Sequence, residues 1–183
     1  MQHLYGKNRT YFITFRLADS LPQSILIDLK KEYRFRIDSI KETNPILRQE
    51  IIDNITIDIF GKYDHQLDKF PDGKCVLRDG KIANILSDQI LKYHKIYYEL
   101  KCYSIMPNHV HILLGSLDQI EENEVDKVDT WMKLIKGGSS RFINRTMNAS
   151  GQLWTHESWY RMKKKKKHYA NSFYYTVNNP EKA

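Results

Sequence analysis

Two histidines that stand two residues apart, His109 and His111, are the residues of this sequence best suited to chemistry. They begin the apolar stretch HVHILL, whose composition predicts a β-strand. Successive side chains of a strand point to opposite faces, so both imidazoles project from one face and Val110 projects from the other, into the core. Two imidazoles on one face are typical of a divalent metal site, although His-x-His pairs also occur by chance among ordinary core and surface histidines.

The C-terminal segment offers a third ligand and a nucleophile. The residues next to the histidines form neither the H-x-H-x-D-H nor the H-E-x-x-H pattern of other metalloenzymes, so a third ligand must come from elsewhere. Tyr175 and Asn179 are four residues apart and would present a phenol and an amide oxygen on one face of a helix. Tyr174 and Asn178 have the same spacing, so spacing does not choose between the pairs. Alternatively, both tyrosines are core aromatics and Asn179 is a helix cap before Pro180.

The rest of the sequence predicts the helices and strands that must position these residues. Strands are expected at residues 11–17, 96–105 and 109–114, and the last two are joined by a tight connection at Met106-Pro107-Asn108. Helices are expected at residues 21–40, 81–94, 130–147 and 163–179, while residues 153–162 are extended or irregular.

The order of these elements predicts one α+β domain over residues 1–183, with helices packed on an antiparallel sheet. Asn44-Pro45 should interrupt the first helix, and Gly137-Gly138 should slacken the third. The signals conflict between residues 46 and 80, and this stretch is predicted to be a variable insertion of mixed structure.

The charge is concentrated near the C-terminus. The chain of 183 residues has a net charge of +7, yet residues 131–183 carry eleven basic and only two acidic side chains. Aromatic residues alternate with these cations, a composition typical of surfaces that bind single-stranded nucleic acid. A solvated basic helix is the alternative interpretation.

Other classes of protein fit the composition poorly. No run of about 18 apolar residues is present, so no membrane span is expected. The first residues do not resemble a secretory signal, and the expected location is the cytoplasm, in association with the nucleoid. Two distant cysteines exclude a disulfide scaffold and a C-x-x-C metal site.

The sequence contains MPNHVHILL at 106–114, GQLW at 151–154 with HES at 156–158, and YTVNNPEKA at 175–183. Together these segments resemble the single-tyrosine HUH transposases, and within them the branch associated with repetitive extragenic palindromes (REP). The N-terminal stretch YFITFRL is similar to the first strand of that family.

The resemblance implies a ferredoxin-like antiparallel sheet with helices packed on it, and a homodimer. By matching positions, His109 and His111 are the histidine pair, Tyr175 is the nucleophile and Asn179 is the third metal ligand. The implied ion is Mg²⁺ or Mn²⁺, and two imidazoles shift the preference toward Mn²⁺. The implied reaction is nicking and rejoining of single-stranded DNA near a hairpin, through a 5′-phosphotyrosine intermediate.

The sequence departs from the family where Trp159-Tyr160-Arg161 and a run of lysines replace acidic residues. These cations, and others on the third predicted helix, are candidate contacts for DNA phosphates. A solubilising face is the competing interpretation. The candidates are Lys133, Lys136, Arg141, Arg145, Arg161, Lys163, Lys164, Lys165, Lys166 and Lys167.

Three rival interpretations remain open at this point. A replication initiator or relaxase could use the same His-x-His pair for nicking, although those enzymes usually place the tyrosine differently. A protein that binds hairpin DNA could keep the fold without turnover. A structural zinc protein is disfavoured because no cysteine is near the histidines in sequence.

Overall fold

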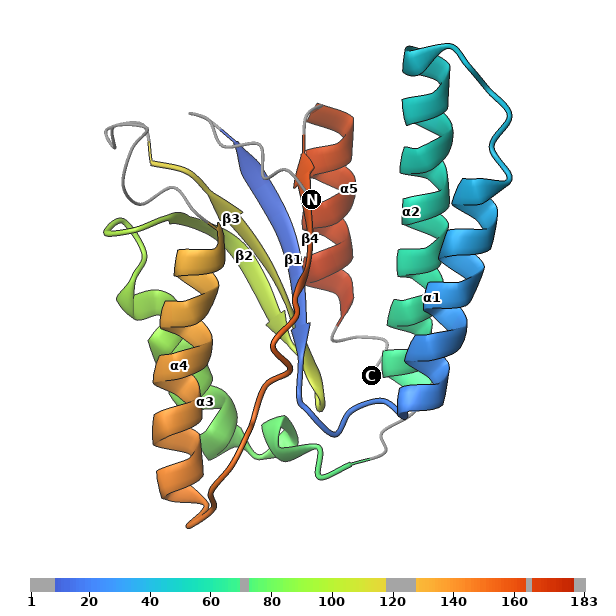
Figure 1. Ribbon diagram of the computed structural model, residues 1–183. Coiled ribbons are helices and arrows are strands. Elements are labelled where there is room, and N and C mark those ends of the chain that lie inside the picture. Colours follow the sequence, from blue (N-terminus) through green and yellow to red (C-terminus); the bar gives the residue numbers. More distant parts are fainter. Residues whose placement is uncertain (1–8, 70–72, 118–127, 164–165, 180–183) are drawn as a thin grey trace. The chain divides into compact units, whose positions relative to one another are not determined.

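The computed structural model describes residues 9–69, 73–117, 128–163 and 166–179. The chain divides into two compact units (Figure 1). One unit, Met1–Ala18 together with Cys75–Ala183, contains a β-sheet and the helices packed on it. The other unit, Asp19–Lys74, is a pair of helices.

The sheet has the ferredoxin-like strand order that the family resemblance implies. Its four strands lie in the order β2-β3-β1-β4, and every neighbouring pair is antiparallel. A helical segment connects β1 to β2, a tight turn connects β2 to β3, and a helix connects β3 to β4. The strands are β1 (Thr10–Arg16), β2 (Glu99–Ile105), β3 (His109–Gly115) and β4 (Trp159–Lys163).

One face of this sheet carries the hydrophobic core. The register pairs Ile13 with Ile112 and Phe15 with Val110, and these four side chains are fully buried. The helices α3 (Gly80–Lys92) and α4 (Val128–Thr146) cover this face (Figure 1). Their apolar residues include Ile82, Leu86, Ile90, Trp131, Ile135 and Ile143.

The opposite face of the sheet is covered by α5 (Lys166–Asn178), which packs on β2, β3 and β4. Figure 1 shows α5 on the side of the sheet away from α3 and α4. Because side chains alternate along a strand, the neighbours of the core residues on β1 and β3 point toward α5. The sheet therefore has one purely structural face and one face that is available for chemistry.

Two local predictions were wrong. Helix α4 runs without interruption through Gly137 and Gly138, because its apolar face is held against the sheet. Strand β2 begins at Glu99 instead of residue 96, because Lys95 has a φ of 64° and its N–H donates to Tyr98 O in a turn. In the part of the chain that the structure describes, no helix combines the length and apolar composition needed to cross a membrane.

The second unit contains α1 (Gln23–Asp38) and α2 (Pro45–Lys69). Most of the stretch for which the sequence signals conflict is thus one continuous helix. The interruption at Asn44-Pro45 is confirmed, since Asn44 Oδ1 accepts hydrogen bonds from the N–H groups of Ile46 and Leu47 at 3.0 and 3.3 Å.

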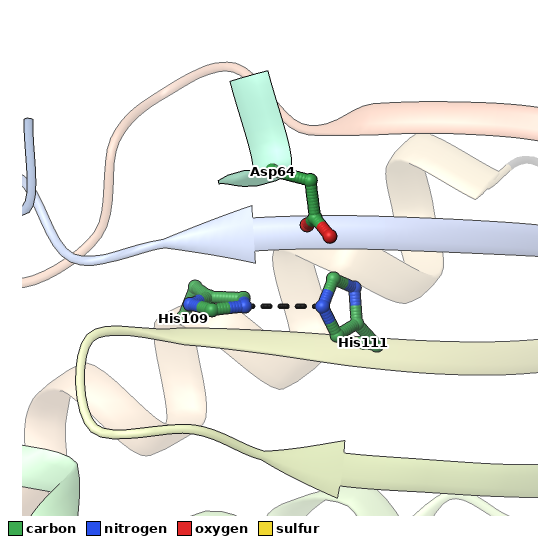
Figure 2. A group of neighbouring side chains, drawn as sticks. All are labelled: Asp64, His109 and His111. Atoms are coloured by element: carbon green, nitrogen blue, oxygen red, sulfur yellow. Dashed lines mark hydrogen bonds between the residues drawn. The ribbon is translucent and has the colours of Figure 1, made fainter. Parts of the chain in front are cut away.

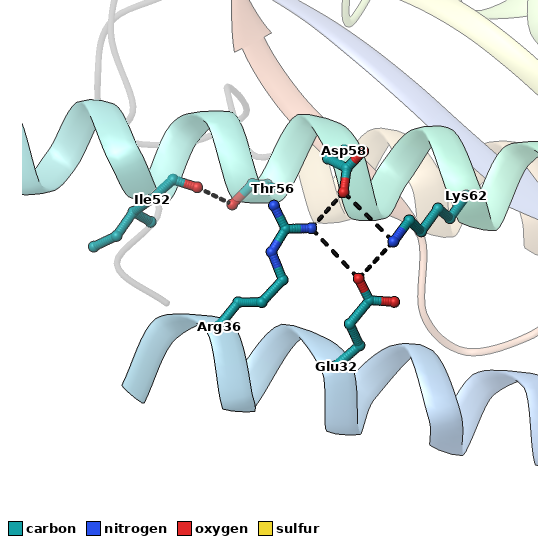
Figure 3. Close-up of polar contacts among 6 residues, drawn as sticks. All are labelled: Glu32, Arg36, Ile52, Thr56, Asp58 and Lys62. Atoms are coloured by element: carbon teal, nitrogen blue, oxygen red, sulfur yellow. Dashed lines mark hydrogen bonds and ion pairs between the residues drawn. The ribbon is translucent and has the colours of Figure 1, made fainter. Parts of the chain in front are cut away.

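Four charged side chains connect α1 and α2 (Figure 3). Arg36 pairs with Asp58, and Lys62 donates to Glu32 Oε1 at 2.5 Å. The hydrogen bond from Arg36 lowers the pKa of Asp58. All four side chains remain substantially exposed, so the ion pairs add little to the free energy of unfolding. Their main effect is to favour one register of α1 against α2.

The two adjacent glycines of α4 should respond differently to alanine. A Cβ at Gly137 would meet nothing within 4 Å, whereas a Cβ at Gly138 would lie 2.4 Å from Gln89 Oε1 on α3. We expect Gly137→Ala to raise the free energy of unfolding by about 0.5–1 kcal/mol. Gly138→Ala should gain clearly less or lose stability, because Gln89 must move. Urea denaturation measures both values, and equal gains would contradict the packing described for α3 and α4.

Candidate functional site

His109 and His111 lie on the face of β3 that is turned toward α5. On β1, the neighbouring strand, Arg16 is opposite His109 and Thr14 is opposite His111. The side chains of both histidines are almost completely buried, at 1% and 0% exposure. Val110 lies in the core on the other face. The predicted projection of the two imidazoles from a single face is therefore confirmed.

The two imidazole rings are joined to each other (Figure 2). Each ring also has a hydrogen-bond partner on its other nitrogen. Their Nε2 atoms are 3.0 Å apart. His109 Nδ1 is 2.7 Å from Asn108 Oδ1, and His111 Nδ1 is 2.8 Å from Thr14 Oγ1. The four side chains thus form a chain of hydrogen bonds in which the Nδ1 atoms face the protein and the Nε2 atoms face each other. Metal-ligating histidines are commonly oriented in this way, by a polar partner on the other ring nitrogen.

Both imidazoles are neutral at ordinary pH. Burial lowers the pKa of His109 to about 3. Burial and, to a smaller extent, the charge of His109 lower the pKa of His111 well below its usual value. Neutral imidazole is the form that binds a metal ion, because protonation removes the lone pair.

Tyr175 is the tyrosine that contacts the histidine pair. Its ring centroid is 5.4 Å from that of His111, and the two planes are nearly perpendicular at 73°. Phe12 supports both rings, stacked on His111 at 5.6 Å and edge-on to Tyr175 at 6.0 Å. Tyr174 is 65% exposed and contacts Phe173 instead. The tertiary structure therefore separates two tyrosines that helical spacing left equivalent.

Asn179 follows directly after α5, and its side chain is fully buried. Neither Oδ1 nor Nδ2 has a hydrogen-bond partner among the described residues. An unpaired buried amide is costly, so a group that binds it in the working protein would remove a penalty of about 1–3 kcal/mol. By contrast, Asn178 is exposed. Two oriented neutral imidazoles are ligands that fit a divalent cation such as Mn²⁺, and the unpaired amide oxygen of Asn179 is of a type that can bind the same ion.

The candidate phosphate-binding residues are not gathered in one place. Lys133, Arg141 and Arg145 are exposed on α4, which covers the core face of the sheet, opposite to the histidines. Arg161 on β4 is paired in register with Phe12, so its side chain lies on the same face as the histidines. Lys164 and Lys165 lie outside the described residues, and of Lys163, Lys166 and Lys167 only the backbone is described.

Lys136 contacts the protein itself. Its Nζ donates to the carbonyl oxygens of Thr155, His156 and Glu157 at 2.9, 3.2 and 3.2 Å. Burial and the charge of Arg16 lower its pKa to about 8. An ammonium group has three hydrogens, and all three are used here. Lys136 therefore holds the segment before β4 in place and has no donor left for a phosphate.

Sequence reasoning missed Thr14 and Asn108, the two anchors of the histidines. Asn108 directly precedes His109, so its amide was a visible candidate for a local hydrogen bond. Thr14 is 97 residues away from His111 in sequence, and only the pairing of β1 with β3 brings them together. No motif in a single sequence reports such a cross-strand contact.

Comparison with known proteins identifies the fold. The structure superimposes on that of a REP-associated tyrosine transposase bound to a REP hairpin with a TM-score of 0.52 and 15% sequence identity, covering 100% of this chain and 72% of that chain. A candidate transposase from Deinococcus radiodurans R1 matches at a TM-score of 0.39 and 16% identity, with 98% and 95% of the chains covered. No protein-family model and no curated protein matches the sequence. The chain therefore shares its α+β fold with a REP-associated tyrosine transposase.

The buried histidines should make the protein acid-sensitive. In the unfolded chain, both imidazoles bind a proton near pH 6.5, whereas the folded protein keeps His109 neutral to about pH 3. The unfolded state thus binds more protons as the pH falls below 6.5, and the free energy of unfolding should decrease there. Urea denaturation between pH 7 and pH 4 measures this decrease. The double variant His109→Gln/His111→Gln should show a smaller decrease, and an unchanged decrease would contradict the assignment.

Proposed function

We propose that this protein is a transposase that nicks and rejoins single-stranded DNA near hairpins through a 5′-phosphotyrosine on Tyr175. The observation that carries the proposal is the contact of the Tyr175 ring with His111, one of two buried neutral imidazoles whose Nε2 atoms converge. The shared fold with a REP-associated tyrosine transposase supports it. DNA is the expected partner and, as the family resemblance implies, so is a second copy of the chain.

The proposed reaction is an exchange of one phosphate ester for another. The Tyr175 oxygen attacks phosphorus, the bond from phosphorus to the 3′ oxygen breaks, and the strand on the 3′ side becomes joined to the tyrosine through its 5′ phosphate. The phenol releases one proton and the departing 3′ oxygen takes up one. Because the ester is conserved in the protein adduct, a 3′-OH can reverse the step and rejoin DNA without an energy source.

His109, His111 and Asn179 are the residues that would hold the divalent cation. When bound, the cation would supply positive charge to the phosphate oxygens and to the departing 3′ oxygen. The protein contributes neutral imidazoles in fixed orientations, and it contributes an amide oxygen that has no other partner among the described residues. Phe12 holds the Tyr175 ring beside this donor set.

Single-stranded DNA is the substrate class that suits the surroundings of Tyr175. A phosphate must approach a buried pair of imidazoles, which an unpaired strand can do more readily than a duplex. Arg161 lies on the histidine face of the sheet, and the run of five lysines directly precedes α5 or begins it. The exposed ring of Tyr174 is positioned on α5 next to the nucleophile, where it offers a surface for stacking an unpaired base.

Covalent capture of DNA tests the proposal directly. The protein is incubated with Mn²⁺ and a pool of hairpin oligonucleotides that carry randomised single-stranded flanks, and the products are separated on a denaturing gel. We expect an adduct that retains a 3′-end label and lacks a 5′-end label, because the 5′ phosphate is the group joined to the tyrosine. Tyr175→Phe should abolish the adduct, since the ring is kept and the nucleophilic oxygen is lost.

Tyr174→Phe is the matched control, because it makes the same change one residue away. It should leave the adduct unchanged. If the wild type binds the hairpins and forms no adduct, the protein is a hairpin-DNA-binding module without turnover. If Tyr174→Phe abolishes the adduct and Tyr175→Phe does not, the assignment of the nucleophile is wrong.

The lysine run should contribute to phosphate binding. Replacing Lys163, Lys164, Lys165, Lys166 and Lys167 by Gln should weaken DNA binding and reduce the slope of log affinity against log salt by about 0.7 for each phosphate that a lysine no longer neutralises. Fluorescence anisotropy at several salt concentrations measures the slope. The triple variant Lys133→Gln/Arg141→Gln/Arg145→Gln, on the opposite face of the sheet, should change it less. An unchanged slope in the variant of the lysine run would show that these lysines do not bind DNA phosphates.

A further inference from the structure

We propose that Thr14 is a positioning residue that allows His111 to hold a divalent cation, because its hydroxyl can either donate to His111 Nδ1 or accept from it. This inference rests on the proposed function, for which it names a further residue of the same site. Thr14 is fully buried, and its Oγ1 is 2.8 Å from Nδ1 of His111. Both residues occupy opposite positions in the pairing of β1 with β3, so the contact is built into the sheet.

The direction of the hydrogen bonds can be derived from the Asn108 end of the chain. Asn108 Oδ1 is a carbonyl oxygen and can only accept, so His109 carries its hydrogen on Nδ1. The neutral His109 ring therefore has no hydrogen on Nε2. Its lone pair at Nε2 faces Nε2 of His111 at 3.0 Å. His109 is thus held in the tautomer that a metal ligand requires.

His111 is in the other tautomer when the two rings are bonded to each other. A hydrogen bond between two nitrogens needs one hydrogen, and His109 Nε2 has none, so His111 Nε2 must donate it. The neutral His111 ring then has a bare Nδ1, and the Thr14 hydroxyl donates to it. The protein therefore contains a directed chain from Thr14 through both imidazoles to Asn108.

Holding a cation requires His111 to change its tautomer. Both Nε2 lone pairs must then be available, so the hydrogen on Nε2 of His111 leaves to solvent and Nδ1 takes one up. The ring stays neutral throughout. The Thr14 hydroxyl rotates and accepts from the new Nδ1–H, so Nδ1 of His111 keeps its partner in both states. An anchor that can only accept, as at Asn108, would leave the bare Nδ1 of His111 unpaired when the two rings are bonded to each other. An anchor that can only donate would leave the Nδ1–H unpaired when the cation is bound.

Metal binding without DNA tests this role. The free Mn²⁺ signal in electron paramagnetic resonance gives the affinity of each variant. Thr14→Val keeps the branched shape and removes the hydroxyl, and it should weaken Mn²⁺ binding by about 10-fold or more, the usual effect of losing such an anchor. Thr14→Ser keeps the hydroxyl and should bind close to wild type. Wild-type affinity in Thr14→Val would overturn the inference.

Thr56→Val is the control for losing a threonine hydroxyl elsewhere. Thr56 Oγ1 donates to Ile52 O within α2, in the other unit (Figure 3). This variant should bind Mn²⁺ like the wild type. If Thr56→Val weakens binding as much as Thr14→Val does, the effect is not specific to the His111 anchor and the inference fails.

The tautomer itself can be observed in the wild-type protein, which avoids any variant that does not fold. Long-range ¹H–¹⁵N spectra of the histidine rings distinguish Nδ1–H from Nε2–H, and Zn²⁺ serves as a diamagnetic probe. We expect His111 to change from Nε2–H to Nδ1–H on addition of Zn²⁺, while His109 keeps Nδ1–H. An unchanged His111 tautomer would overturn the proposal.

These measurements are independent of the Tyr175 adduct. A protein that binds Mn²⁺ with the expected dependence on Thr14, but forms no adduct with DNA, would support the role of Thr14 and overturn the proposed function. An adduct together with unaltered Mn²⁺ binding in Thr14→Val would support the proposed function and overturn the role of Thr14.

Discussion

The 3.0 Å contact between the Nε2 atoms of His109 and His111 is the constraint on which the rest of the site depends. Two buried imidazoles this close share a single hydrogen between them, so both cannot be charged, and the other nitrogen of each ring needs a partner. The alternation of side chains on β3 places them on one face, β1 contributes Thr14, and the turn before β3 contributes Asn108. The arrangement requires a sheet that does not shift, because a slip of one residue would turn both rings into the core.

The opposite face of the sheet supplies that rigidity. Val110, which lies between the two histidines in sequence, is buried among the core residues that α3 and α4 cover. Strand β3 thus contributes Val110 to the hydrophobic core on one face and the two histidines to the candidate site on the other. Helix α5 closes the second face, where it sets the ring of Tyr175 against His111 and is followed by the buried amide of Asn179. An apolar core and a polar site therefore share one sheet without mixing.

Net charge describes this protein less well than the position of each cation does. The basic C-terminal third appears uniform along the sequence, yet its members have different surroundings in the structure. Lys136 gives all three of its hydrogens to backbone carbonyls, the exposed cations of α4 lie on the core side, and Arg161 lies on the histidine side. Counting charges in a sequence predicts that a polyanion is bound, but it does not predict which side chains are available to bind it.

The sequence by itself determined the strand that carries the histidines, the face they share, the α+β class and the break at Asn44-Pro45, because these depend on local periodicity and turn chemistry. The ferredoxin-like strand order was implied only by the family resemblance. Helical spacing left Tyr174 and Tyr175 equivalent, although the family resemblance implied Tyr175. The two glycines predicted a slackened α4, and nothing in the sequence suggested Thr14. Only the tertiary structure decided these points. Contacts between segments far apart in the chain decide all three points. They determine which tyrosine contacts a histidine, whether α4 continues through two glycines and which hydroxyl binds the His111 ring.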